Sequence, residues 1–340
     1  MRPRQFTTAL CVVGLLAACN TTQPSPSIQL RPITLLLGFQ PDVQFAPFYY
    51  AQQHGEYAAA GLDVTIEYKG DADLVRLVGD GQAEFGVTDA TDVMISRTAG
   101  IPIKYVATLY RQFPVALIGP KGTVPAEPAE LAGRRIGTPG RYGSSWHALL
   151  ALLDAGGLTA EDVTIREYPQ FNQVDGLLNG DVDFITGFRN NEPLRLAARG
   201  METDLLTVEQ FAPLPGPGLV VGDGLLAADP TLVQDFVNAT VMALAPIAAD
   251  PQLGVDAAVV AVPSIASDTA TALKVMTATV PLWTLAEGGI SPLFDEEAWT
   301  KGYATMQRLG FIDGSVPLAE MVATGPFDEP STSPVTSPAT

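Results

Sequence analysis

Cysteine and histidine are scarce in this chain. Only two of its 340 residues are cysteine and only two are histidine. A structural zinc site needs about four closely spaced Cys or His ligands, and a disulfide framework needs cysteines distributed along the chain. Cys11 and Cys19 both fall within the first nineteen residues. A Cys/His zinc centre and a disulfide-stapled fold are therefore excluded for the remainder of the sequence.

Positive charge is scarce as well. The chain has 19 Lys and Arg against 37 Asp and Glu, which gives a net charge of −18. Nucleic acids and anionic lipid surfaces are bound through clustered Lys and Arg, so neither is an expected partner. Because 47% of the residues are apolar and only 16% are charged, the chain is globular and rich in core. Its length suffices for two domains of ordinary size.

The N-terminus has the pattern of an export signal. Arg2 and Arg4 precede the apolar run Ala9–Leu16, which is too short to span a bilayer, and the sequence Leu-Ala-Ala-Cys then ends at Cys19. This order resembles a bacterial lipoprotein signal, in which residues 1–18 are removed and Cys19 is lipidated. A plain secretory signal is the alternative. No other stretch is expected to cross a membrane, so we expect an exported protein held on the cell membrane by lipid, facing the periplasm or the cell exterior.

The first globular stretch has the pattern of a βαβ unit. Ile33–Leu37 is an apolar run that predicts a buried strand, Phe48–Ala60 predicts a helix, and Leu62–Glu67 predicts a second strand. Ligands of such parallel sheets bind beyond the carboxyl ends of the strands. Gln44 and Phe45 lie in the loop at that end, and an amide beside a ring suits an aromatic ligand with a hydrogen-bonding edge. The alternative is that Phe45 belongs to the core.

Strands and helices continue to alternate along the chain, and two breaks in composition interrupt them. The first break is rich in Gly, Pro and Lys (119–128) and the second in Pro and Gly (213–218). We interpret them as crossings between two lobes. The predicted division is a tether (19–31), a first lobe (32–119 with 218–327), a second lobe (120–217) and a Pro/Ser/Thr-rich disordered tail (328–340). After residue 230 the pattern is helical and completes the first lobe.

Further candidate contacts follow the ends of the later strands. They are Asp89, Tyr110, Gln112, Tyr142, Ser144, Ser145, Phe188, Asn190 and Glu192. The glycine-bearing turn at 139–145 precedes a helix, and the free amides of a helix start bind an acceptor atom or an anion. Three structural alternatives stay open: Asp89 or Thr91 caps the helix after it, Ser144 or Ser145 caps theirs, and Glu192 lies in the first turn of a helix.

Four stretches together are similar to one protein family. They are GFQPDVQFAPFYYAQQHGEYAAAGLDV, EFGVTDATDVMISRTAGIPIKYVA, GTPGRYGSSWHALL and GFRNNEP. They resemble the ABC-transporter solute-binding proteins for thiamine-pyrimidine precursors and riboflavin, a family that also includes the eukaryotic thiamine-pyrimidine synthases. The resemblance covers about Ile33 to Val221. It implies an α/β fold of the type II periplasmic binding proteins, with two lobes, a ligand cleft between them and a helical C-terminal part.

The resemblance also implies the site and the partners. The ligand would lie between the lobes against aromatic rings, a permease would receive it, and the protein would act as a monomer. The implied ligand contacts are Gln44, Phe45, Asp89, Tyr110, Gln112, Tyr142, Ser144, Ser145, Phe188, Asn190 and Glu192. The synthase branch uses a stretch rich in Cys and His together with iron. This chain has no Cys after Cys19 and only His54 and His147. The prediction is therefore a binding protein with no catalytic residue, metal or cofactor.

Among ligands the sequence favours riboflavin, because its aromatic residues are numerous and well spread, which suits a large ring system. A thiamine pyrimidine precursor is the alternative. An anion such as a sulfonate or nitrate is a third possibility, because Arg111, Arg141 and Arg189 all lie on the candidate loops. A Ser–His–Asp hydrolase is disfavoured, since the sequence has no Gly-x-Ser-x-Gly elbow.

Overall fold

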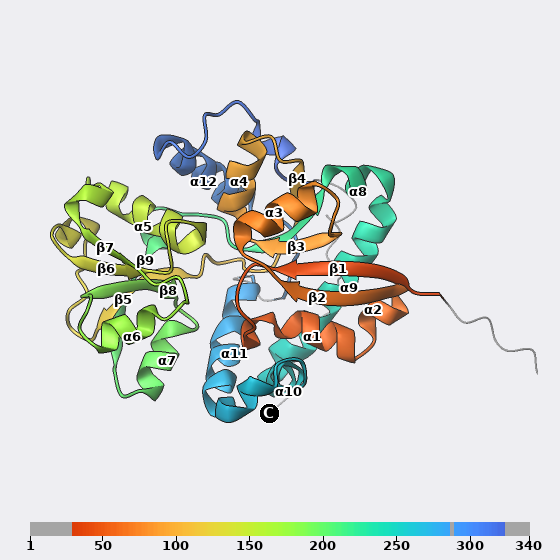
Figure 1. Ribbon diagram of the computed structural model, residues 1–340, viewed down its shortest axis with the longest axis horizontal. Coiled ribbons are helices and arrows are strands. Elements are labelled where there is room, and N and C mark those ends of the chain that lie inside the picture. The colour runs from red at the N-terminus through yellow and green to blue at the C-terminus, as the bar shows by residue number, and fades with distance from the viewer. Residues whose placement is uncertain (1–28, 286–288, 324–340) are drawn as a thin grey trace, which may run out of the picture.

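The computed structural model describes residues 29–285 and 289–323 of the chain. The signal segment 1–18, Cys19, the tether up to residue 28 and the tail 328–340 lie outside these residues. The described chain is an α/β protein of two lobes, each built on a five-stranded mixed sheet covered by helices (Figure 1). This is the predicted fold class.

The first sheet holds the predicted βαβ unit. Its strand order is β2-β1-β3-β10-β4, with β1 parallel to β2 and β3 and with β10 antiparallel to both of its neighbours. Successive side chains of a strand point to opposite faces, so Leu35 and Leu37 enter one core and Leu36 enters the other. The strands are β1 Arg31–Leu37, β2 Leu62–Tyr68, β3 Phe85–Thr88, β4 Ile103–Thr108 and β10 Gly218–Gly222.

Helices cover both faces of the first sheet, and the C-terminal helices complete this lobe as predicted. On one face Phe236 of α9 stacks on Phe85 of β3, with ring centroids 3.8 Å apart. On the other face Trp299 of α12 packs edge-on against Tyr105 of β4. The helices of this lobe are α1 Ala46–Gln53, α2 Glu56–Ala59, α3 Asp71–Gly79, α4 Ala90–Thr98, α8 Asp223–Ala228, α9 Pro230–Ala249, α10 Pro251–Ala261, α11 Thr269–Trp283 and α12 Glu296–Arg308.

Two helical predictions need correction. The helix expected over 48–60 is split into α1 and α2 at Gly55, whose φ of 80° is a left-handed conformation that ends a helix. The expectation that nothing after the signal could cross a membrane also fails on length and composition, because α9 is long and apolar enough. Half of its most apolar window is buried inside the first lobe, where it packs against α1 and α10.

The second sheet has the strand order β7-β6-β8-β5-β9. Its central strands are apolar on both faces, with α5 packed on one side and α6 and α7 on the other. The strands are β5 Val115–Pro120, β6 Arg135–Thr138, β7 Thr164–Glu167, β8 Phe184–Phe188 and β9 Thr203–Thr207, and the helices are α5 Gly143–Ala155, α6 Gln173–Leu178 and α7 Glu192–Ala198.

The first crossing between the lobes lies at 109–114 and not at 119–128. β4 belongs to the first sheet and β5 already to the second, so the boundary predicted at residue 119 is wrong. The Gly/Pro/Lys stretch is instead a surface turn of the second lobe, with Lys121, Gly122 and Thr123 exposed. The return crossing, 211–217, leads into β10 as predicted. The two crossing segments lie side by side, because the N–H groups of Leu109 and Tyr110 donate to the carbonyl of Pro217.

Candidate functional site

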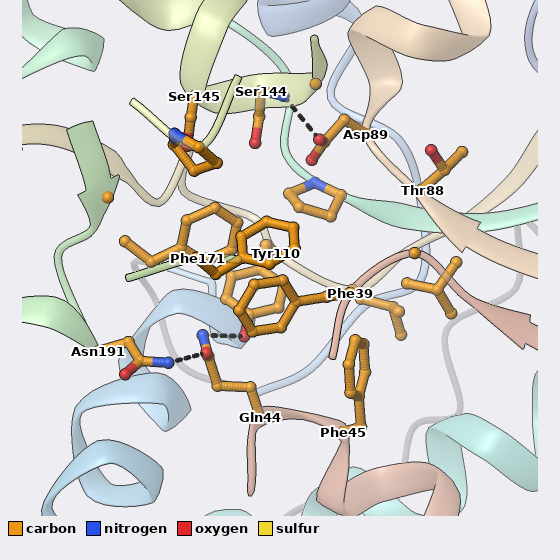
Figure 2. Close-up of a pocket in the computed structure, with 18 of the residues that line it drawn as sticks. Phe39, Gln44, Phe45, Thr88, Asp89, Tyr110, Ser144, Ser145, Phe171 and Asn191 are labelled. Carbon is orange, nitrogen blue, oxygen red and sulfur yellow. Dashed lines mark hydrogen bonds between the residues drawn. The ribbon is translucent and has the colours of Figure 1, made fainter. Parts of the chain in front are cut away.

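A cavity lies between the two lobes, beside the crossing segments (Figure 2). It contains about 1050 Å³ of atom-free space, part of which is open to solvent. Residues of both lobes line it: Gly38, Phe39, Gln44, Phe45, Pro47, Phe48, Val87, Thr88, Asp89, Leu109, Tyr110, Pro139, Tyr142, Gly143, Ser144, Ser145, Phe171, Gln173, Gly187, Phe188, Asn191, Glu192, Pro217, Leu244 and Trp283.

Aromatic rings from opposite lobes meet in this cavity. Phe39 follows β1 in the first lobe, Phe171 precedes α6 in the second, and their ring centroids are 4.7 Å apart in an edge-to-face arrangement. Figure 2 shows Tyr110 beside this pair. Phe171 has a φ of 55°, the only left-handed non-glycine backbone among the described residues, and such a backbone costs about 1–2 kcal/mol. The second lobe therefore holds Phe171 in the cavity wall with an unfavourable backbone conformation.

Polar contacts join the lobes along one edge of the cavity. Arg195 of α7 donates to Asp42 of the first lobe at 2.5 Å, and the amide of Asn191 donates to the side-chain oxygen of Gln44. Gln44 also donates to the hydroxyl of Tyr110 at 3.4 Å. Burial raises the pKa of Asp42, and the Arg195 guanidinium offsets part of that rise. These contacts join the two lobes at this edge.

A second set of contacts joins the lobes along the other edge. The backbone N–H of Ser144 in α5 donates to the Asp89 carboxylate at 2.8 Å (Figure 2). His147 of α5 shares a hydrogen bond of 2.9 Å with Thr91 of α4, and burial lowers the pKa of its imidazole to about 4. His147 therefore sits neutral between two helices at neutral pH. It bridges the lobes and does not line the cavity.

Glu192 is a second carboxyl group in the cavity wall. It is the first residue of α7, and its Oε2 accepts the N–H of Phe188 at 2.7 Å. The side chain folds back over β8 at Gly187, where a Cβ atom would stand 2.8 Å from the carboxyl carbon. Burial raises the pKa of Glu192 to about 7. Its carboxyl group therefore changes charge near neutral pH.

The pKa of Glu192 gives a prediction for stability. Because the folded-state pKa of about 7 lies above the ordinary value of 4.5, its stabilising contribution is full below about pH 4.5 and is lost as pH rises through about 7. Glu192→Gln removes this titration. Between pH 5 and pH 8 we expect the wild-type chain to lose about 2 kcal/mol of unfolding free energy relative to the variant. Urea unfolding of both proteins at the two pH values measures the difference.

The comparison with the variant is needed because His147 titrates in the opposite sense. Its lowered pKa gives a contribution that is present above about pH 6.5 and is lost as pH falls toward 4. That contribution is common to both proteins and cancels. Parallel pH profiles for the wild type and Glu192→Gln would contradict the buried, titrating carboxyl group.

The structure gathers most of the predicted contact residues around the cavity. Nine of the eleven line it: Gln44, Phe45, Asp89, Tyr110, Tyr142, Ser144, Ser145, Phe188 and Glu192. Gln112 does not, because its amide donates to Pro281 and accepts from Arg189 outside the cavity. Asn190 does not, because it is buried against Thr279 of α11. The neighbouring Asn191 faces the cavity in its place.

The three structural alternatives are also resolved. Asp89 stands at the N-cap position of α4, yet its side chain accepts no hydrogen bond from that helix. Ser144 and Ser145 lie inside the first turn of α5, whose N-cap residue is Tyr142. Glu192 does lie in the first turn of α7, as its alternative required, and it lines the cavity as well.

The three arginines on the candidate loops point elsewhere. Arg111 donates to the carbonyl of Leu293, Arg141 pairs with Glu167 at 3.0 Å, and Arg189 donates to Gln112. None of the described residues that line the cavity is Lys or Arg. The argument for an anionic ligand that rested on these side chains therefore loses its basis.

The cavity also has contributors that the sequence reasoning missed. Phe39 follows β1 closely, so strand-end reasoning pointed to its loop, but the prediction there named only Gln44 and Phe45. Phe171 and Gln173 lie in a loop and at the start of the short helix α6. Trp283 belongs to the core and is only 2% exposed, and it also forms part of the wall. Thr88 ends β3, and its hydroxyl has no hydrogen-bond partner among the described residues.

Comparison with known proteins identifies the family. The sequence profile described as "NMT1/THI5 like" matches residues 42–253. The riboflavin-binding protein RibY of Chloroflexus aurantiacus is 31% identical over 336 residues, which cover 93% of this chain and 95% of that protein. The chain belongs to the NMT1/THI5-like family. The matched segment includes all of the predicted contact residues.

Two other relatives are named for different functions. The formylaminopyrimidine-binding protein of Halalkalibacterium halodurans is 24% identical over 188 residues, covering 55% of this chain and 56% of that protein. A 4-amino-5-hydroxymethyl-2-methylpyrimidine phosphate synthase of Legionella pneumophila is 26% identical over 216 residues, covering 61% of this chain and 66% of the enzyme. The relatives of this chain thus include proteins named as binding proteins and a protein named as an enzyme.

Solved structures confirm the fold. The periplasmic aliphatic sulphonate-binding protein SsuA from Escherichia coli superposes with a TM-score of 0.66 at 13% sequence identity, covering 91% of this chain and 97% of that one. At this level of identity the likeness shows the fold alone. This member of the NMT1/THI5-like family therefore has the periplasmic-binding-protein architecture that its sequence predicted.

Proposed function

We propose that this chain is an extracytoplasmic solute-binding protein that captures riboflavin, or a related flat heteroaromatic vitamin, between its two lobes. The observation that carries the proposal is the aromatic cavity at the lobe interface. Phe39 and Phe171 approach it from opposite lobes, and Tyr110 lies beside them. Two carboxyl groups, Asp89 and Glu192, provide hydrogen-bond acceptors in its wall. This combination suits a ring system with N–H or O–H donors.

The physical basis is stacking combined with enclosure. A planar ring inserted between Phe39 and Phe171 would separate them and gain a contact on each face, and aromatic stacking is worth about 1–3 kcal/mol per ring. Closure of the lobes removes water and strengthens the hydrogen bonds inside. Useful capture needs a dissociation constant of roughly micromolar or tighter, about −8 kcal/mol. The identity to RibY over almost the full chain supports riboflavin as the first candidate.

A thiamine pyrimidine precursor is the second candidate. An aminopyrimidine carries an exocyclic amino group, and the carboxyl groups of Glu192 and Asp89 are suitable acceptors for it. The relative named for formylaminopyrimidine supports this alternative. The two ligands differ in size. A single pyrimidine ring is smaller than riboflavin, so it would leave much of the cavity to water.

We propose binding and not catalysis as the role of the cavity. Ser145 lines the cavity, but His147, two residues along α5, is turned toward Thr91 of the other lobe. His54 stacks on Tyr50 at the end of α1 with ring centroids 3.8 Å apart. Neither imidazole is placed to take a proton from a ligand in the cavity. Conversion of riboflavin or an aminopyrimidine by the purified protein would contradict this part of the proposal.

Export and delivery are also part of the proposal. The signal-like segment would be removed before Cys19, and lipid on Cys19 would hold a monomeric protein at the membrane. The partner would be the permease of an ABC importer, which accepts the ligand when the lobes open. Mass spectrometry of the membrane-extracted protein tests the anchor. A mature chain that begins at Cys19 and carries acyl groups is expected, and an unmodified N-terminus would contradict it.

The absorption spectrum of the protein, purified from cells supplied with riboflavin, tests the ligand. A flavin band that stays with the protein through gel filtration is expected. If the band is absent, calorimetric titration with riboflavin and with an aminopyrimidine decides between the two candidates. Heat only from the aminopyrimidine would replace the first candidate with the second.

A further inference from the structure

Asp89 stands at the N-cap position of one helix but binds the start of another. Its backbone is extended before α4, with φ −75° and ψ 142°, and its side chain accepts no N–H from that helix. An aspartate in this position ordinarily caps its own helix. Its Oδ2 instead accepts the N–H of Ser144 in α5, across the cleft, at 2.8 Å (Figure 2). Asp89 thus makes a contact between the lobes in place of a capping bond to α4.

Helix α5 has no cap of its own. It runs from Gly143 to Ala155, its N-cap residue Tyr142 makes no side-chain capping bond, and its first turn has no acidic residue. The free N–H groups and the positive end of the helix dipole make such a start a site for anions. The Asp89 carboxylate occupies it. Partial burial raises the pKa of Asp89, and hydrogen bonds from Ser144 offset part of that rise.

Hydroxyl groups also lie near this position. Thr88, next to Asp89, lines the cavity and is 4% exposed, and its buried hydroxyl has no hydrogen-bond partner among the described residues. Ser144 and Ser145 place two more hydroxyl groups in the cavity wall. The described lining contains no Lys or Arg, and the positive helix end at the start of α5 is already neutralised by a carboxylate of the protein.

We propose that Asp89 is an internal anion that fills the anion position at the start of α5 when the lobes close. The chain thereby rejects ligands carrying sulfate, sulfonate or phosphate groups and selects uncharged ones. A bound anion would have to displace the carboxylate and would remain close to it, at a cost in repulsion. The inference deepens the proposed function, and it rests on it only in taking the cavity as the ligand site.

Inorganic sulfate is the probe that tests this role. Asp89→Ala vacates the position, whereas Asp89→Asn keeps an oxygen that accepts the N–H of Ser144. The two variants have the same net charge, so a difference between them reports the vacated position. Trp146 in the first turn of α5 and Trp283 in the cavity wall provide a fluorescence signal. Sulfate is titrated against chloride at matched ionic strength, and unfolding curves confirm that each variant is folded.

The expected result is sulfate binding by Asp89→Ala that is at least ~10-fold tighter than by the wild type or by Asp89→Asn. Equal responses of Asp89→Ala and the wild type, or equal gains in both variants, would overturn the inference. If Asp89→Ala does not fold, Asp89→Gly replaces it, because glycine suits an N-cap position. Riboflavin binding by the same proteins is measured in a separate titration. Absence of riboflavin binding by the wild type would refute the proposed ligand without affecting the sulfate result.

Discussion

Replacing Phe39 and Phe171 together by alanine is expected to weaken riboflavin binding by at least ~100-fold. Each ring would supply one face of the stack, and at about 1.4 kcal/mol per stacked ring, within the usual range of about 1–3 kcal/mol, the pair accounts for two factors of ten. Each single variant is expected to lose ~10-fold. Quenching of flavin fluorescence by the stripped protein measures the dissociation constants.

The control for this pair is Tyr50→Ala. Tyr50 is an aromatic residue of α1 that stacks on His54 and does not line the cavity. Its loss is expected to leave riboflavin affinity within ~2-fold of the wild type. Phe171→Ala relieves the strain of the left-handed backbone at position 171 only in part, since alanine is strained there too. Unchanged affinity in the double variant would place the flavin elsewhere.

Arg195→Ala is expected to open the lobes. The substitution leaves the buried Asp42 carboxylate, only 4% exposed, without its cationic partner. Removing one partner of a buried pair costs about 3–5 kcal/mol. Because the Arg195 side chain is 45% exposed, we expect a smaller cost to the closed arrangement, about 1–3 kcal/mol. Ligand affinity should fall by ~10-fold or more, and small-angle scattering should show a larger radius of gyration.

Two further variants separate lobe closure from simple loss of an arginine. Arg199 follows α7 and pairs with Asp175 on the surface of the same lobe at 2.5 Å. Arg199→Ala is therefore expected to change neither affinity nor shape. Adding Asp42→Asn to Arg195→Ala removes the buried charge and should restore part of the affinity. An Arg195→Ala protein with the scattering profile and affinity of the wild type would show that this contact does not hold the lobes.

The sequence predicted the fold closely wherever apolar runs were bounded by turns. The strands predicted at Ile33–Leu37 and Leu62–Glu67 fall within β1 and β2, and the return crossing before β10 was found at its Pro and Gly residues. The first crossing was misplaced because composition marks exposed turns, and the stretch around Gly122 is such a turn. The true crossing is aromatic and partly buried, with Tyr110 and Phe113 both buried. Its Arg111 N–H donates to the carbonyl of Leu282. Buried crossings carry no compositional signal.

The site was predictable only to the level of loops. Strand-end reasoning found Asp89, Tyr110 and Glu192, because ligands of open α/β sheets bind beyond strand ends. It chose Asn190 where Asn191 lines the cavity, since the choice between them depends on backbone angles at the start of α7. It missed Phe171 because its ring is directed by a left-handed backbone, which favours glycine and gives no signal at a phenylalanine.

Titration of the stripped wild-type protein with riboflavin tests the central claim most directly. The claim is that the cavity between the lobes takes a flat heteroaromatic ligand against Phe39, Phe171 and Tyr110. The predicted result is saturable quenching of flavin fluorescence, one site per chain, with a dissociation constant of roughly micromolar or tighter. Free flavin fluorescence that stays unchanged up to ~100 µM protein, about 100-fold above that constant, would contradict the claim.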